Sequence, residues 1–158
     1  MLVMLAIAAL AMPACAPPFP KDLLDKVEKN VSFSDLFKDP EPYRGKLLLL
    51  GGIIVETKNL KEGTQIEVLQ KALDNESRPY MTDETAGRFL IVSSQFIDAA
   101  VYQRGRQITV LGEAAGSKTQ QLGEAEYRYP VITAKDLHLW APYSGPRFSI
   151  GIGVFKGY

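Results

Sequence analysis

Two adjacent glycines, Gly51 and Gly52, interrupt a long aliphatic segment that runs from Lys46 to Thr57. A nearly continuous aliphatic segment of this kind is typical of a buried strand. A glycine inside a strand indicates a bend or a close approach between backbones, because it has no side chain to keep the two chains apart. A small barrel needs such a bend where one strand is shared by two sheets. The segment therefore favours a small, strongly curved β-barrel.

Four further segments have strand character. The second and fourth segments alternate apolar and polar residues, so one face of each is expected to be wet. Ser94 is expected to cap a short helix with Phe96, Ile97, Ala100 and Val101 on one face. The expected strands are residues 46–57, 64–73, 88–92, 106–113 and 131–140. Five strands with a helix between the third and the fourth follow the order of an OB-type barrel, so we expect a mainly β, OB-like five-stranded barrel.

The segments around these strands are shorter or more polar. Residues 21–30 predict a short amphipathic helix, and Ser34 is expected to cap a second helical turn that runs through Phe37. Residues 74–87 and 116–126 are polar and are expected to form loops.

One motif repeats at an offset of sixty residues. Arg-Gly-Lys at residues 44–46, followed by aliphatic residues and Gly52, resembles Arg-Gly-Arg at residues 104–106, followed by aliphatic residues and Gly112. The elements between the two copies differ. We therefore interpret the repeat as two similar turns that lead into strands, rather than as a duplication.

The first fourteen residues are almost wholly apolar, and the first charged residue is Lys21. An apolar run of this length is typical of a secretory signal and is too short to span a bilayer comfortably. It leads into Cys15, the single cysteine, which is the layout of a lipobox. The thiol is required there because it forms the thioether bond to a diacylglycerol. The alternatives are an uncleaved anchor helix and a buried core segment with a spare thiol.

These features predict how the chain is divided. We expect a signal peptide in residues 1–14, lipidated Cys15 and a proline-containing spacer in residues 15–20, a β domain in residues 21–142, and a tail rich in glycine and aromatic residues in residues 143–158. Ala16 favours the outer membrane, because many Gram-negative inner-membrane lipoproteins carry Asp after the cysteine. The predicted partner is therefore the outer membrane, reached through the lipid. A single cysteine allows no disulfide within the chain, so packing alone must stabilise the fold.

Several kinds of chemistry are disfavoured. The chain has 18 Lys plus Arg and 18 Asp plus Glu, and this neutral balance argues against a nucleic-acid partner. His138 is the only histidine, which disfavours both a catalytic triad and a zinc site. The alternation places His138 on the face of its strand opposite Leu137 and Leu139. Scattered carboxylates leave a hydrolase as a remote alternative. We therefore expect no catalytic residues, no metal and no cofactor.

Aromatic and basic residues form a candidate binding face: Tyr80, Tyr127, Arg128, Tyr129 and Trp140. OB-like barrels often bind ligands across one sheet face, with aromatic rings as stacking platforms. The alternative is that the tyrosines close the ends of the barrel, and we prefer that interpretation.

Several motifs in a fixed order resemble the Slp family of outer-membrane lipoproteins, of the starvation-inducible type. The resemblance covers roughly residues 39–142 and the cysteine. It implies a lipoprotein that faces the periplasm, and it implies no catalytic residues. The motifs are residues 42–46 leading into 51–53, residues 87–90 leading into 96–98, the Val101-Tyr102 pair before residues 108–112, and residues 137–140.

The sequence thus supports a non-enzymatic outer-membrane lipoprotein with a structural or binding role in the cell envelope. Envelope proteins or glycans are the expected partners. A periplasmic protein that binds an oligosaccharide or another small ligand is the alternative, motivated by Tyr127 and Tyr129 near the last strand.

Overall fold

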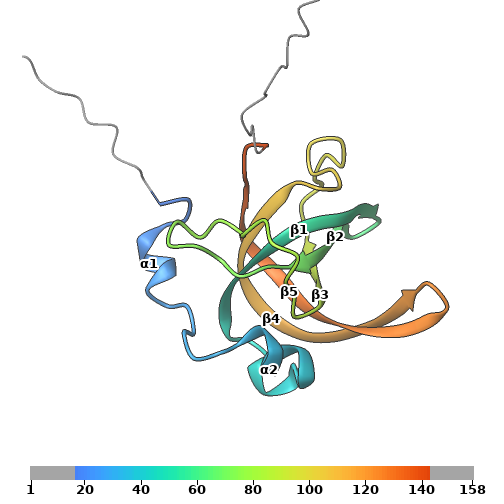
Figure 1. The fold of residues 1–158 in the computed structure, drawn as a ribbon, viewed down its shortest axis with the longest axis horizontal. Coiled ribbons are helices and arrows are strands. Elements are labelled where there is room, and N and C mark those ends of the chain that lie inside the picture. Colours follow the sequence, from blue (N-terminus) through green and yellow to red (C-terminus); the bar gives the residue numbers. More distant parts are fainter. Residues whose placement is uncertain (1–16, 143–158) are drawn as a thin grey trace, which may run out of the picture.

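A closed barrel of five strands forms the centre of the computed structural model, which describes residues 17–142 (Figure 1). The hydrogen-bonded order is β1-β2-β3-β5-β4, closing back onto β1. All neighbours are antiparallel except β3 and β5, which pair in parallel over three residue pairs. This confirms the mainly β, OB-like barrel expected from the sequence. The strands are β1 (Leu47–Leu60), β2 (Gly63–Gln70), β3 (Arg88–Ser93), β4 (Gln107–Leu122) and β5 (Ala125–Leu139).

Short helices precede the barrel: α1 (Lys21–Leu24), α2 (Phe33–Lys38) and the 3-10 turn η1 (Glu41–Tyr43). The helix predicted for residues 21–30 is therefore only four residues long. The second helix begins earlier than predicted, because its cap is Ser32, whose Oγ accepts a hydrogen bond from the Asp35 backbone N–H at 3.1 Å. The predicted signal peptide, Cys15 and the predicted tail lie outside the described residues.

The barrel interior is filled by aliphatic and aromatic side chains from every strand. Ile66, Val68, Phe89 and Ile91 alternate with outward-facing neighbours along β2 and β3 and are completely buried. Helix α2 adds Leu36 to the same cluster and closes one end of the barrel. Alternate residues of β2 and β3 therefore fill the core, although Leu90 on the opposite face of β3 is completely buried as well.

Glycines stand where two strands approach too closely for a side chain. A Cβ built on Gly52 would overlap the Leu69 carbonyl oxygen and would lie 2.8 Å from Val68 Cγ1. A Cβ on Gly112 would lie 2.5 Å from the Thr133 carbonyl oxygen, next to a register shift between β4 and β5. The close approach expected from the sequence is present at Gly52, and Gly112 has one as well.

The sixty-residue repeat corresponds to two matching turns at opposite ends of one strand pair. Gly45 and Gly105 have φ values of +79° and +87°, and each lies just before a strand. The Gly45 N–H donates to the Ala114 carbonyl at 2.8 Å, and the Gly105 N–H donates to the Ile54 carbonyl at 2.9 Å. Because β1 and β4 are antiparallel neighbours, each turn anchors the start of one strand to the other.

The helix predicted after Ser94 is wrong. Residues 94–106 form bends and turns, with Phe96 76% exposed and Ile97 buried. Side-chain hydrogen bonds hold these turns: Asp98 Oδ1 accepts from Ala100 N at 2.8 Å, and Thr64 Oγ1 of β2 accepts from Ile97 N at 2.9 Å. Side-chain acceptors thus take the N–H groups that a helix would need.

The polar loop predicted for residues 116–126 is also wrong. Apart from the turn at Gly123 and Glu124, these residues are paired strand, and β4 and β5 continue together from Ser117–Pro130 to Leu122–Ala125. Both faces of this hairpin are largely polar, so no apolar alternation marks it in the sequence. We call residues 117–130 the arm; it extends beyond the barrel at the lower right of Figure 1. A register shift between Ala114 and Ser117 separates the arm from the barrel, and Gly116 there has a φ of +87°.

Candidate functional site

A groove with a mixed polar and apolar lining lies between the two hairpins of the barrel, β1–β2 and β4–β5. It consists of two adjoining hollows of about 520 and 370 Å³, which share Leu60, Gln65 and Lys118 as lining residues. We call these two hollows together the hairpin groove. Leu60, at the tip of β1, is 49% exposed and provides the apolar part of the wall. OB barrels bind oligosaccharides and oligonucleotides over strands β2 and β3 and beside these same two loops.

Amide and ammonium groups converge on the floor of the hairpin groove. Gln65 is only 6% exposed, and its Oε1 accepts hydrogen bonds from Lys118 Nζ at 3.0 Å and from Gln120 Nε2 at 3.3 Å. The remaining N–H donors of Lys118 and Gln120 are available to a ligand oxygen. The arrangement is therefore suited to binding hydroxyl and carbonyl groups.

Beneath the arm, Glu67 joins a charged and a phenolic side chain. Glu67 Oε1 lies 2.7 Å from Arg88 Nη1 and 3.3 Å from the Tyr129 hydroxyl. Tyr129 is 1% exposed, and this burial, together with the neighbouring Glu67 carboxylate, raises the pKa of Tyr129 above its ordinary value. The hydrogen bond to Glu67 likewise raises the pKa of Arg88. The arm thus covers the outer face of β2 and β3 with a closed polar network.

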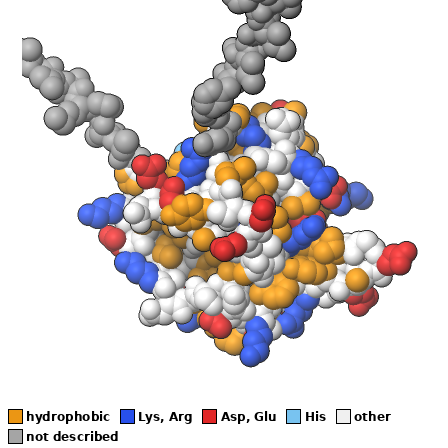
Figure 2. All heavy atoms as spheres, viewed as in Figure 1, with side chains coloured by type: hydrophobic (Ala, Val, Ile, Leu, Met, Phe, Trp, Pro, Cys, Tyr) orange, Lys and Arg blue, Asp and Glu red, His pale blue; other side chains and the backbone are white. Residues whose placement is uncertain are grey.

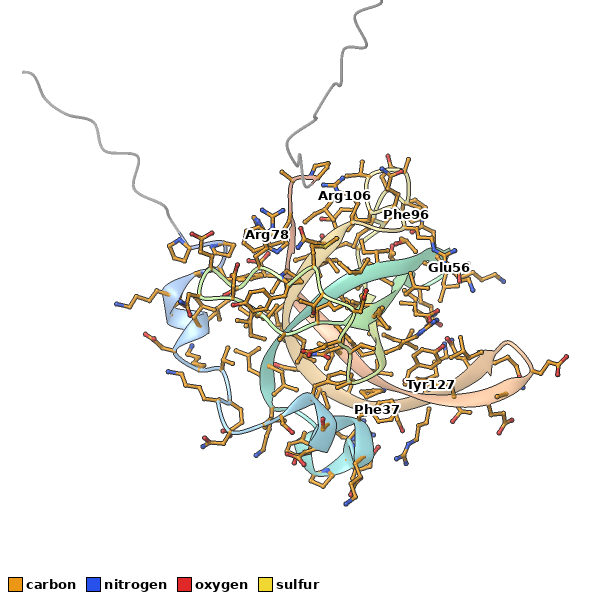
Figure 3. All side chains as sticks on the ribbon, viewed as in Figure 1. Phe37, Glu56, Arg78, Phe96, Arg106 and Tyr127 are labelled. Carbon is orange, nitrogen blue, oxygen red and sulfur yellow. The ribbon has the colours of Figure 1, made fainter. Side chains whose placement is uncertain are left out.

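Tyr127 and Arg128 attach the arm to helix α2 and strand β3. The Tyr127 ring lies 5.6 Å from the Phe37 ring and 4.6 Å from the Tyr129 ring, and its oxygen accepts from the Arg88 backbone N–H at 3.0 Å. Figure 3 shows Tyr127 and Phe37 together at the base of the arm. Arg128 Nη2 donates to the Lys38 carbonyl at 2.6 Å. These contacts use both the ring faces and the polar atoms of the tyrosines.

The other two residues of the predicted face lie elsewhere. Trp140 follows the opposite end of β5, where its Nε1 donates to Thr109 Oγ1 at 2.9 Å and its ring lies 5.4 Å from the Arg78 guanidinium carbon. Tyr80 is half-exposed in the loop between β2 and β3. The structure therefore brings Tyr127, Arg128 and Tyr129 together and separates them from Trp140, so the five residues do not form one face.

His138 lies on the face of β5 opposite Leu137 and Leu139, as the alternation predicts. Both leucines pack against the core cluster. The His138 ring is half-buried between aromatic rings, 4.4 Å from Trp140 and 6.2 Å from Phe19. Phe19, expected in the spacer, is instead 2% exposed and covers this face.

Apart from the hairpin groove, a hollow of about 380 Å³ lies beside His138 and Trp140. Prolines of the N-terminal segment form one wall, and the ends of β5 and the β2–β3 loop form the other. We call it the N-terminal hollow; its lining includes Pro17, Pro18, Leu24, Ser77, His138 and Trp140.

Sequence patterns did not identify the residues of the hairpin groove. Gln65 was expected on the wet face of its strand, where most polar residues are merely solvated. Lys118 and Gln120 fell in a segment expected to be a loop. The signal that would have revealed them is the pairing of the arm, which brings them over Gln65.

Neither a cluster of metal ligands nor a membrane-spanning helix is found within residues 17–142. No three His, Cys, Asp or Glu side chains in this range are grouped as metal ligands would be. None of the helices described in this range is long and apolar enough to cross a bilayer. Figure 2 shows mixed basic, acidic and hydrophobic side chains over the visible face, with acidic groups at the tip of the arm.

Comparison with known proteins gives a family match over most of the chain. The sequence model of the family described as "Outer membrane lipoprotein Slp family" matches residues 12–150. An uncharacterized protein of Haemophilus influenzae is 34% identical over 60% of this chain and 52% of its own length. The outer membrane protein Slp of Escherichia coli is 26% identical over 69% of this chain and 57% of its own length. The uncharacterized E. coli lipoprotein YeaY is 27% identical over 64% of this chain and 52% of its own length. The chain spans about half the length of these relatives.

Solved structures of similar shape are more distant. A mitochondrial single-stranded DNA binding protein of S. cerevisiae, Rim1, is 15% identical over 60% of this chain and 94% of its own, with a TM-score of 0.37. A small single-stranded DNA-binding protein of Streptomyces coelicolor is 12% identical over 61% of this chain and 94% of its own length, with a TM-score of 0.38.

Proposed function

Because the chain belongs to the outer membrane lipoprotein Slp family, we propose that a lipid on Cys15 holds it at the outer membrane, with its barrel in the periplasm and a binding rather than a catalytic role. The observation that carries this proposal is the extent of the family match, which begins before Cys15 and continues through the whole barrel. The printed names of two E. coli relatives, a lipoprotein and an outer membrane protein, support it. Ala16 after the cysteine supports outer-membrane sorting.

Replacing Cys15 tests the anchor. Cys15→Ser is expected to abolish incorporation of radioactive palmitate, because serine cannot form the thioether bond. The wild-type protein is expected to fractionate with outer-membrane markers on a density gradient. Equal labelling of the two proteins would overturn the lipid anchor, and fractionation with inner-membrane markers would overturn the location.

The hairpin groove supports a second, more specific role in binding an oligosaccharide or a similar neutral polar ligand. Gln65, Lys118 and Gln120 present hydrogen-bonding groups in one place, and Leu60 offers an apolar surface beside them. The equal numbers of acidic and basic residues match a ligand without a large charge. Tyr127 and Tyr129 would then hold the arm that forms one wall, instead of stacking on the ligand.

Calorimetric titration with soluble peptidoglycan glycan fragments tests this role. Lys118→Met should weaken binding by about ten- to hundredfold, because a charge-assisted hydrogen bond contributes about 1.5–3 kcal/mol. Lys135→Met is the matched control, since Lys135 is a half-exposed β5 lysine that is paired with Glu113 outside the groove. Equal affinity of the wild-type and Lys118→Met proteins would exclude the groove as the site.

A further inference from the structure

Phe19 fixes the N-terminal segment to the barrel. Its ring is 2% exposed and lies edge-on to His138, which in turn contacts Trp140. Full burial of a phenylalanine side chain stabilises by about 1.5–3 kcal/mol, enough to keep the segment docked most of the time. The chain between the predicted lipid and the barrel is therefore shorter than the whole spacer of residues 15–20.

The length of this connection limits where the membrane can lie. Cys15 and Pro17 are two residues apart, so their Cα atoms are separated by about 7 Å at most. Pro17 lines the N-terminal hollow together with His138 and Trp140. A lipid on Cys15 would thus enter the bilayer next to this hollow.

Half of the N-terminal hollow is suited to a membrane surface, and Asn75, Glu76 and Ser77 are its polar lining residues. Pro17, Pro18 and Leu24 are apolar, and Trp140 has the ring type that is enriched where lipid headgroups meet acyl chains. The Trp140 N–H is bonded to Thr109, so the polar atom of the ring already has a partner inside the protein. Arg78 lies over that ring and adds a positive charge that attracts anionic headgroups.

From this geometry we propose that the end of the barrel around Trp140 and the N-terminal hollow rests on the bilayer that holds the lipid anchor. The proposal rests on the lipidation of Cys15 proposed above. The β4–β5 ribbon leads away from this end, from Ile108–Leu139 to Leu122–Ala125, over fourteen residues or about 45 Å of strand path. The tip of the arm is therefore directed into the periplasm. Figure 3 shows the two regions apart, with Arg78 near the N-terminal segment and Tyr127 in the arm.

Trp140 is the only tryptophan in the chain, so its fluorescence reports this orientation directly. The lipidated protein is incorporated into vesicles of phosphatidylethanolamine and phosphatidylglycerol, with or without phospholipids brominated near the headgroup. Bromine quenches tryptophan only at close range. We expect brominated vesicles to lower Trp140 emission by about half, whereas the non-lipidated Cys15→Ser protein should show no change.

Two variants separate orientation from anchoring. In Trp140→Phe/Glu124→Trp the reporter moves to the exposed turn at the tip of the arm, where we expect no quenching. Phe19→Ala should keep the lipid but reduce quenching at Trp140, because the N-terminal segment is released from β5. Flotation with the vesicles is measured for every variant, and circular dichroism checks that each is folded.

The outcomes distinguish the two proposals. A protein that floats with the vesicles but shows unquenched Trp140 overturns the orientation and leaves the lipid anchor intact. Quenching at the arm tip equal to that at Trp140 overturns it as well. A wild-type protein that does not float overturns the anchor and, with it, the orientation. Flotation with strong quenching at Trp140 and none at the arm tip is the result that supports the proposal.

Discussion

Adding a single methyl group at Gly52 should destabilise the whole barrel. A Cβ there would overlap the Leu69 carbonyl oxygen and would lie 2.8 Å from both the Leu69 carbonyl carbon and Val68 Cγ1. Comfortable carbon–carbon contacts are about 3.5–4.0 Å, so β1 and β2 would have to separate by roughly 0.7 Å or more. The obstacle is backbone, which cannot rotate away as the end of a side chain can.

The magnitude follows from these contacts. Overpacking costs about 1–3 kcal/mol, and weakening one or two ladder hydrogen bonds adds about 1 kcal/mol each. The lower chain entropy of unfolded alanine offsets about 0.4–1 kcal/mol. Gly52→Ala should therefore lower the free energy of unfolding by about 2–4 kcal/mol. With an m-value of about 2 kcal/mol/M, the urea midpoint falls by about 1–2 M.

Gly105→Ala is the matched control for this experiment. Gly105 has a φ of +87° but no atom within 4 Å of an added Cβ, so its substitution tests backbone conformation without crowding. Its cost should be about 1 kcal/mol, because the left-handed conformation costs about 1–2 kcal/mol and the same entropy term offsets part of it. Both variants are measured by urea unfolding of the chain from residue 15 onward, with Cys15→Ser. A Gly52→Ala midpoint as high as that of wild type would refute the close contact.

Four further substitutions test the contacts beneath the arm and on β5. The pKa of Tyr129 is raised above 10.0 in the folded protein. The neutral phenol therefore contributes stability that is complete below pH 10 and is lost as the pH rises further. Above pH 10, the urea midpoint of Tyr129→Phe should fall less steeply than that of wild type. Glu67→Gln should cost about 1–3 kcal/mol by removing the negative charge that faces Arg88, and a double-mutant cycle with Arg88→Met should show a coupling of at least about 0.5 kcal/mol. His138→Gln should lower stability by about 1 kcal/mol in thermal melts, since it loses ring contacts with Phe19 and Trp140, and a variant that melts like wild type would show that these contacts contribute little.

β2 and β4 were predictable because apolar and polar residues alternate along them, and β1 was predictable because it is a long aliphatic segment. Ile66, Val68, Ile108 and Val110 are completely buried, and each was identified by the same period of two. The crowded glycines were also predictable, because a glycine between the aliphatic residues of a strand is typical of a bend or a close backbone approach. Strand register, once anchored on these positions, placed His138 correctly opposite the core.

The segment after Ser94 and the arm were both predicted wrongly, but for opposite reasons. Phe96 and Ile97 have helical spacing with Ala100 and Val101, but no surface receives Phe96, and side-chain acceptors stabilise turns instead. The arm has no apolar face to detect, because much of it is exposed. Its pairing depends on the continuation of β4 and β5 from the barrel, which is a property of the fold and not of the local sequence.

The hairpin groove could not be predicted either, because it also depends on the pairing of the arm. Gln65 and Lys118 are fifty-three residues apart and meet only because the arm passes over β2. Tyr127 and Tyr129, which the sequence suggested as binding residues, instead make contacts that hold the arm in place. Polar side chains that form a site between distant strands have no local pattern that distinguishes them from solvated surface.

The short parallel contact between β3 and β5 makes one side of the barrel easier to open than the rest. Only Leu90, Ile91 and Val92 pair there, with residues 131–133, whereas β4 and β5 stay paired along nearly their whole length. Local opening in folded proteins follows the weakest cooperative contact, so amide hydrogens along this line should exchange with solvent before those between β1 and β4. Each opening also frees the edge of β3, with Ile91 beside it, to pair with a strand of another molecule. On a crowded membrane surface, the length of this three-residue contact would therefore set how readily neighbouring copies aggregate.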